Sequence, residues 1–247
     1  MSFLTLSLNG CVTTTESSAF TKNTTPEKAL RSHVDAAYDY LRRGDFENAR
    51  RHLRNAEDIN QNDASLNNAM AYSYELSGDV DLADKSYRKA ISLDGSLTSA
   101  RNNYGVFLFK QERYKEARVQ FIKVVSDTLY PGRGAAFNSL GVCQLRLENY
   151  AEAKIAFERA LDLDRINRLP LLELASVGIK LDDFEYARKK YDTYKLVAAP
   201  SAKSLLVGAE IADHYNMKHD LASIEIALKN RFPDSTEYQE FKKRFKL

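Results

Sequence analysis

Apolar residues along this chain recur at intervals of three and four, the spacing that places side chains on one face of a helix. The segment from Tyr150 to Asp164 shows the pattern most clearly, because Ala153, Phe157 and Ala160 fall on one face. Similar triplets recur at steps of 34 residues and once of 36 residues. They are Ala49, Leu53 and Ala56; Ala83, Tyr87 and Ala90; Ala117, Phe121 and Val124; and Ala187, Tyr191 and Tyr194. A period this constant predicts stacked helical hairpins and not one globular core.

The helix before each triplet carries a doublet whose second residue is always small. The doublets are Ala36-Ala37, Met70-Ala71, Tyr104-Gly105, Leu140-Gly141, Leu174-Ala175 and Gly208-Ala209. Small residues let two helices approach to the short end of the usual interaxial range of about 8–10 Å. Doublet and triplet together resemble the tetratricopeptide repeat (TPR). We therefore predict an all-α fold, a right-handed TPR superhelix (α-solenoid) of about six helix-turn-helix repeats with a C-terminal capping helix.

The predicted solenoid occupies residues 26–247 and follows residues 1–25, a short apolar run and a polar linker that are considered below as the end of a lipoprotein signal peptide. Thr25 and Pro26 suit the start of a helix, and Gly44 and Gly78 suit the turns between helices. The expected repeats cover approximately residues 30–63, 64–97, 98–131, 134–167, 168–201 and 202–233, with the cap at 234–247. In the cap, Tyr238, Phe241 and Phe245 are expected to face inward.

Charge and hydropathy narrow the function classes. The 36 Lys and Arg nearly balance the 34 Asp and Glu, for a net charge of +2. A nucleic-acid-binding protein normally carries a clear basic excess, so we expect no nucleic-acid partner. The sequence contains no run of 18 or more apolar residues, and it therefore predicts no membrane-spanning helix.

The sequence offers little support for catalysis. The four histidines, at 33, 52, 214 and 219, show no metal-ligand spacing and no neighbouring nucleophile, and no glycine-rich phosphate loop occurs. Cys143 follows the doublet of the fourth repeat, where it is expected to pack as a small hydrophobe. We therefore expect a binding protein with no enzymatic activity, cofactor, metal or small-molecule substrate.

A protein-binding groove is expected on the first helices of the repeats, which line the concave side of such a solenoid. Equivalent positions in three consecutive repeats hold amides, which offer both a donor and an acceptor to an extended peptide. The alternative is that these amides pair with neighbouring helices or water. Apolar residues beside the amides form a strip suited to a partner helix or strand. The candidate groove residues are Tyr38, Asn68, Tyr72, Asn102, Val106, Phe109, Asn138 and Val142.

The N-terminus contains a candidate lipid-attachment site. A short apolar run ends in Leu8-Asn9-Gly10-Cys11 and is followed by Thr- and Ser-rich sequence. This arrangement resembles the end of a bacterial lipoprotein signal peptide, which is cut before a cysteine that is then acylated. Val12 after the cysteine, in place of aspartate, implies by the same resemblance an outer-membrane destination. The alternative is an unstructured N-terminus in which Cys11 is incidental.

The chain resembles one family over almost its whole length, and four stretches carry the resemblance most specifically. They are Asn102–Leu108, Asp127–Pro131, Ser204–Gly208, and Phe232-Pro233 followed by Glu237–Phe241. Most residues in these four stretches are not required by the TPR pattern. The stretches are similar to those of the PilF/PilW family, the TPR outer-membrane lipoproteins of type IV pilus biogenesis known as pilotins.

The resemblance implies a role in assembling the outer-membrane secretin ring. The protein would be anchored through acylated Cys11 with its TPR domain in the periplasm, and would bind secretin subunits and promote their localisation and multimerisation. One alternative is a periplasmic TPR scaffold lipoprotein that recruits cell-wall enzymes or proteases. Another is a cytoplasmic co-chaperone that binds carboxylate tails, for which only Lys110, Arg146 and Lys180 approach the required cations.

Overall fold

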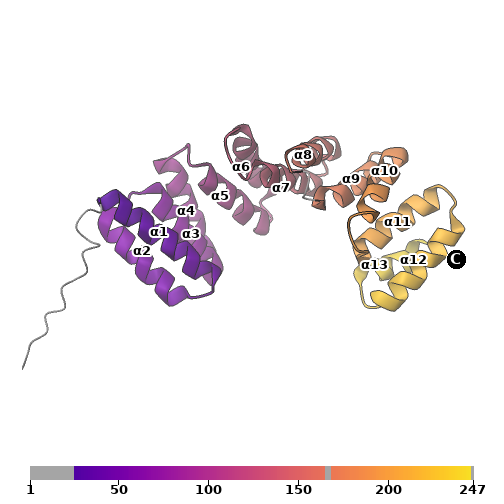
Figure 1. Ribbon diagram of the computed structural model, residues 1–247, viewed down its shortest axis with the longest axis horizontal. Helices are drawn as coiled ribbons and strands as arrows, with labels where there is room; N and C mark the ends of the chain where they lie inside the picture. Colours follow the sequence, from indigo (N-terminus) through magenta and orange to yellow (C-terminus); the bar gives the residue numbers. More distant parts are fainter. Residues whose placement is uncertain (1–24, 165–167, 246–247) are drawn as a thin grey trace, which may run out of the picture. The chain divides into compact units, whose positions relative to one another are not determined.

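The computed structural model describes residues 25–164 and 168–245, and in these ranges the chain forms thirteen α-helices and no β-strand (Figure 1). The all-α prediction is confirmed. The helices are α1 (Pro26–Arg42), α2 (Phe46–Asn60), α3 (Ala64–Ser77), α4 (Val80–Leu93), α5 (Thr98–Lys110), α6 (Tyr114–Ser126), α7 (Arg133–Arg146), α8 (Tyr150–Leu163), α9 (Leu169–Lys180), α10 (Phe184–Lys195), α11 (Ala202–His214), α12 (Lys218–Arg231) and α13 (Thr236–Arg244). Cys11 lies outside the described residues, as do residues 165–167 of the fourth predicted repeat.

The chain divides between Gln61 and Asn62 into two units. The first unit contains a hairpin of α1 and α2, and its core consists of Leu30, Val34, Ala37, Leu41, Ala49, Leu53 and Ala56, all buried. The hydroxyl of Thr25 accepts a hydrogen bond from the Lys28 amide and caps α1, with Pro26 at the first helical position. At the turn, Gly44 adopts a left-handed backbone with φ of 75°, and Asp45 caps α2.

The second unit contains the hairpins α3–α4, α5–α6, α7–α8, α9–α10 and α11–α12, and ends in α13. In the first four of these hairpins the predicted crossing residue is an alanine with no exposed surface. A Cβ built on Gly178 of α9 would lie only 2.9 Å from the Cβ of Ala187, so these two helices touch almost backbone to backbone. The large residue of the triplet fills the space beside this contact: a Cβ on Gly141 would lie 2.6 Å from the ring of Phe157. The packing predicted from the triplets is therefore present.

Aromatic side chains pack between consecutive hairpins of the second unit. The ring of Tyr87 on α4 lies 5.6 Å from that of Tyr104 and 5.4 Å from that of Phe107, both on α5. Phe157 on α8 belongs to a buried cluster with Leu174 and Val177 of α9. Each hairpin therefore buries apolar surface against the next, as a repeat fold requires.

Each turn within the hairpins of the second unit contains a residue in the left-handed backbone conformation, which is glycine in one turn and another residue in the other four. Gly78 has φ of 83° between α3 and α4. The next four turns place Glu112, Glu148, Asp182 and Asn216 at φ between 54° and 59°. A side chain in this conformation costs about 1–2 kcal/mol relative to the right-handed region. Hairpin geometry therefore imposes these conformations against local preference.

The first helices of the second unit's hairpins pack against one another, in the series α3, α5, α7, α9 and α11, whereas the second helices make no such contacts. The first helices therefore lie on the inner side of the stack. At its C-terminal end, α13 covers α11 and buries Tyr238, Phe241 and Phe245 against Leu205 and Ala209. No helix in residues 25–164 and 168–245 has both the length and the apolar character needed to cross a membrane.

Candidate binding surfaces

The three predicted amides lie on α3, α5 and α7, the inner helices of the second unit, but their environments differ. Asn68 is only 4% exposed, and its Oδ1 accepts a hydrogen bond of 3.2 Å from the Nδ2 of Asn103 on the neighbouring inner helix. Asn102 is half-buried on the face of α5. Asn138 is also half-buried, and its Oδ1 is shielded from solvent without a hydrogen-bond partner among the described residues. Asn68 therefore links two helices, and Asn102 is the more accessible amide.

The predicted apolar strip is partly exposed. Tyr72 on α3, Val106 and Phe109 on α5, and Val142 on α7 are all half-buried. Phe109 packs its ring 5.1 Å from that of Tyr114. Val106 and Val142 each pack with one face against a buried cluster. Tyr38, the candidate in the first unit, is half-buried on α1 with its hydroxyl shielded from solvent.

Polar contacts around Glu75 link α3 to α4 and α5. Lys110 forms an ion pair of 2.7 Å with Glu75, which also accepts a hydrogen bond from the hydroxyl of Tyr87. Lys110 is therefore already engaged by a carboxylate of the same unit. This ion pair does not favour the co-chaperone alternative, which needs Lys110 to be available to a carboxylate tail.

A polar network around Asp84 was not evident from the sequence. Asp84 on α4 accepts hydrogen bonds from the guanidinium groups of Arg88 and Arg113 and from the hydroxyl of Tyr104, at 2.7, 2.6 and 2.9 Å. Burial opposes ionisation of Asp84, but these donors outweigh it and hold the pKa of Asp84 below its usual value. Burial and the bond to Asp84 raise the pKa of Tyr104 to about 12. The network ties together α4, α5 and α6.

The structure also places the residues that the sequence left without a clear role. His33 on α1 and His52 on α2 share a hydrogen bond of 2.9 Å between their Nδ1 atoms, and burial together with His33 lowers the pKa of His52. His214 stacks on Phe184 at 3.6 Å. Cys143 is buried, and burial raises the pKa of its thiol to about 11. Among the described residues, no group of three or more His, Cys, Asp or Glu is placed to hold a metal ion.

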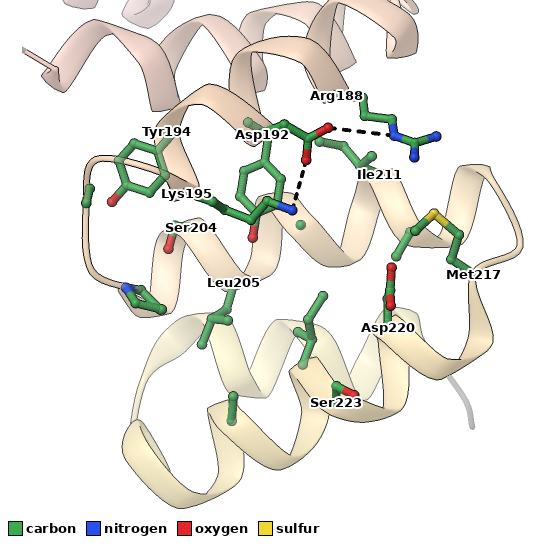
Figure 2. A pocket seen from close by; sticks show the side chains of 17 residues that line it. Arg188, Asp192, Tyr194, Lys195, Ser204, Leu205, Ile211, Met217, Asp220 and Ser223 are labelled. Atoms are coloured by element: carbon green, nitrogen blue, oxygen red, sulfur yellow. Dashed lines mark ion pairs between the residues drawn. The ribbon is translucent and has the colours of Figure 1, made fainter.

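A pocket of about 600 Å³ opens between α10, α11 and α12 in the second unit (Figure 2). Gly208 of α11 lies under the ring of Tyr191, and a Cβ at Gly208 would lie 2.3 Å from the Tyr191 hydroxyl oxygen. Burial raises the pKa of this tyrosine to about 12. On the α10 wall, Asp192 pairs with Lys195 at 2.8 Å and more distantly with Arg188 at 3.9 Å. This pocket was not predicted from the sequence.

The sequence signals for the pocket are two departures from the triplet. Counting 34 residues on from Ala187 gives Leu221, so the last hairpin has a leucine where the other five have alanine. Tyr194 likewise stands where four other repeats have alanine or valine. Larger residues at crossing points hold helices further apart.

Comparisons with known proteins identify the relatives of this chain. The tetratricopeptide repeat family matches residues 64–96 and 95–166. The type IV pilus assembly protein PilF of Pseudomonas aeruginosa is 34% identical over 238 residues, which cover 96% of this chain and 94% of that protein. A solved structure of P. aeruginosa PilF superimposes with a TM-score of 0.79 and covers 89% of this chain and 99% of that one.

A crystal structure of PilW, described as a widely conserved type IV pilus biogenesis factor, supports the fold. It superimposes with a TM-score of 0.73 at 24% identity, covering 86% of this chain and 98% of that one. The TPR fold and the resemblance stated from the sequence are thus confirmed. With more than 30% identity across nearly the full length of both proteins, the chain belongs to the PilF family of TPR-containing type IV pilus assembly proteins.

Proposed function

We propose that this protein is a non-catalytic TPR lipoprotein that acts as a pilotin in type IV pilus biogenesis. It binds subunits of the outer-membrane secretin and promotes their localisation in the outer membrane and their multimerisation. The observation that carries the proposal is the 34% identity to PilF over 96% of the chain. The match extends over nearly the whole length of both proteins.

The inner surface of the second unit supports a role in holding a polypeptide. Its half-buried residues combine an accessible amide, Asn102, with the apolar side chains of Val106 and Phe109 on the same helix. An amide hydrogen-bonds a peptide backbone of any sequence, and the apolar groups favour burial of a partner's side chains. Such a surface suits a client segment that is held and then released to a growing ring.

Anchoring is the second part of the proposal and depends on Cys11. A single acyl chain binds membranes only marginally, and stable attachment needs more than one. Maturation of a bacterial lipoprotein adds several chains to one cysteine, which would fix the TPR domain on the periplasmic side of the outer membrane. The anchor would then determine where the protein is located, and the TPR domain would bind the client.

The test of client binding uses two adjacent asparagines of α5. Asn102→Ala removes an accessible amide, whereas Asn103→Ala removes the donor that bonds Asn68. We expect Asn102→Ala to lower the recovery of secretin with the tagged protein about three- to tenfold at an unchanged melting temperature. Asn103→Ala is expected to lower the melting temperature. Normal secretin recovery with both Asn102→Ala and the double variant Val106→Ala/Phe109→Ala would contradict binding on this face.

A further inference from the structure

We propose that the pocket between α10, α11 and α12 is a docking site for an amphipathic α-helix of a partner protein. The site is separate from the α5 residues assigned above to the secretin, and the proposal does not depend on that assignment. It rests on the shape of the pocket, the state of its polar groups and its unpaired charge.

The shape is that of a groove between two helices. The second helices α10 and α12 form the walls, and the inner helix α11 forms the floor (Figure 2). Leu221 stands where the other crossings have alanine, and a larger residue at a crossing favours a wider spacing of α11 and α12. Ile224 and Ala227 of α12 face Leu205 and Ala212 of α11 across an apolar lining. A volume of about 600 Å³ lies within the range of sites that enclose a ligand and accommodates several apolar side chains from one helix face.

The polar groups of the lining favour a helix over an extended strand. The hydroxyls of Ser204 and Ser223 already donate to carbonyl oxygens of their own segments, Ser201 at 3.0 Å and His219 at 2.9 Å. The Tyr194 hydroxyl reaches the carbonyl of Ala199 at 3.5 Å. Few groups are thus left to bond the backbone of an extended peptide. A helix satisfies its own backbone hydrogen bonds and needs mainly apolar contact.

One hydroxyl remains for the partner. The Tyr191 hydroxyl lines the pocket over Gly208 and makes no hydrogen bond with the described residues. A hydroxyl that lines the pocket can donate a hydrogen bond to an acceptor on the docked helix, which adds affinity. We expect a side-chain acceptor on the docked helix, such as Gln or Glu.

The charges specify the partner further. On the α10 wall Asp192 is satisfied by Lys195 and Arg188. Asp220, in the first turn of α12, lines the pocket and forms no ion pair with any residue that the structure describes. A basic residue at the matching edge of the docked helix would complement it.

The test is a titration of the full chain with synthetic helical peptides of about 18 residues, or five turns. The first peptide carries a leucine stripe at i, i+3, i+4 and i+7 and lysines along one edge of it. The second has the same composition in an order that destroys the stripe, and the third has glutamates in place of the lysines. Calorimetry gives the dissociation constants, and circular dichroism confirms that each protein variant is folded.

Two adjacent residues of α12 give a matched pair of variants. Ser223 lines the pocket and Ala222 does not, although both are exposed on α12. We expect the striped lysine peptide to bind, Ser223→Trp to weaken it at least about tenfold by filling the pocket, and Ala222→Trp to leave it unchanged. Tyr191→Phe should weaken binding of a striped peptide with an added glutamine about three- to tenfold.

A charge-reversal variant gives the decisive comparison. With Asp220→Lys, the preference between lysine and glutamate peptides should invert, while Asp213→Lys outside the pocket should leave it unchanged. Three results would overturn the proposal: no binding of the striped peptides, equal binding of striped and scrambled peptides, or equal effects of Ser223→Trp and Ala222→Trp. Secretin recovery is measured separately, so failure here leaves the pilotin proposal standing.

Discussion

Two glycines of α7 provide a quantitative test of the packing that defines the repeats. Gly141 faces the fully buried ring of Phe157, and a Cβ there would lie 2.6 Å from both Cδ1 and Cε1 of the ring. Gly134, in the first turn of the same helix, is less crowded, since the nearest neighbour to a new Cβ would be the Cβ of Asp164 at 3.3 Å, a contact that a shift of a few tenths of an ångström at the end of α8 relieves. Alanine at these two positions therefore makes the same chemical change in different packing environments.

The expected energies follow from two opposing effects. Alanine is better than glycine within a helix by up to about 1 kcal/mol. Overpacking a well-filled core costs about 1–3 kcal/mol. Because Phe157 is a rigid ring with no exposed surface, it cannot move aside cheaply. We expect Gly134→Ala to be neutral or slightly stabilising, and Gly141→Ala to be less stable than Gly134→Ala by about 1–3 kcal/mol.

The assay is urea unfolding followed by circular dichroism, with the slope checked because repeat proteins can lose cooperativity. The double variant Gly141→Ala/Phe157→Leu tests the cause, since a smaller side chain removes the clash. We expect the cost of Gly141→Ala to be smaller in the Phe157→Leu background. Equal stability of the two single alanine variants, or no coupling in the double variant, would refute the packing argument.

Three further predictions concern turns, the polar network and pH. Glu148→Gly should stabilise the protein by up to about 1 kcal/mol in urea unfolding, because φ of 59° is strained for glutamate, and an unchanged midpoint would contradict this. Asp84→Asn should cost about 1 kcal/mol by the same assay, since it weakens the bonds from Arg88 and Arg113, and a stability equal to wild type would argue against the network. The lowered pKa of His52 means that the folded hairpin binds fewer protons than the unfolded chain. The hairpin therefore keeps its full stability above the unfolded pKa of about 6.5 and loses stability as the pH falls below that value. Amide exchange in α1 and α2, corrected for intrinsic rates, should show reduced protection at low pH, which His52→Gln should largely abolish; equal protection in the wild type would contradict this.

The helical pairs could be predicted because their determinants are local and periodic. Ala153 and Phe157 lie four residues apart, and their burial follows from helix geometry alone. The fate of each inner residue depends instead on neighbouring helices. Asn68 and Asn102 are equivalent in the repeat, yet only Asn68 receives a hydrogen bond from Asn103. Sequence position identifies the face of the helix but not the bonding of one amide.

Features formed between segments distant in sequence were missed for the same reason. The pair of His33 and His52 is 19 residues apart and forms only when α1 and α2 cross. Asp84 and Arg113 are 29 residues apart and meet through side-chain conformations that the repeat does not encode. The pocket lies beside two departures from the repeat, Leu221 and Tyr194, and its lining from α10, α11 and α12 comes together only in three dimensions.

The most direct test of the pilotin account is the state of the secretin in the native bacterium. Membranes are fractionated from wild type, from a strain that lacks the protein, and from Cys11→Ala and Cys143→Ala strains, and the secretin is followed as a heat-resistant multimer. The account predicts that deletion abolishes or misplaces the multimer, that Cys11→Ala releases the protein from the outer membrane with the same defect, and that Cys143→Ala retains normal localisation. Normal secretin multimers in the outer membrane of the deletion strain would contradict it.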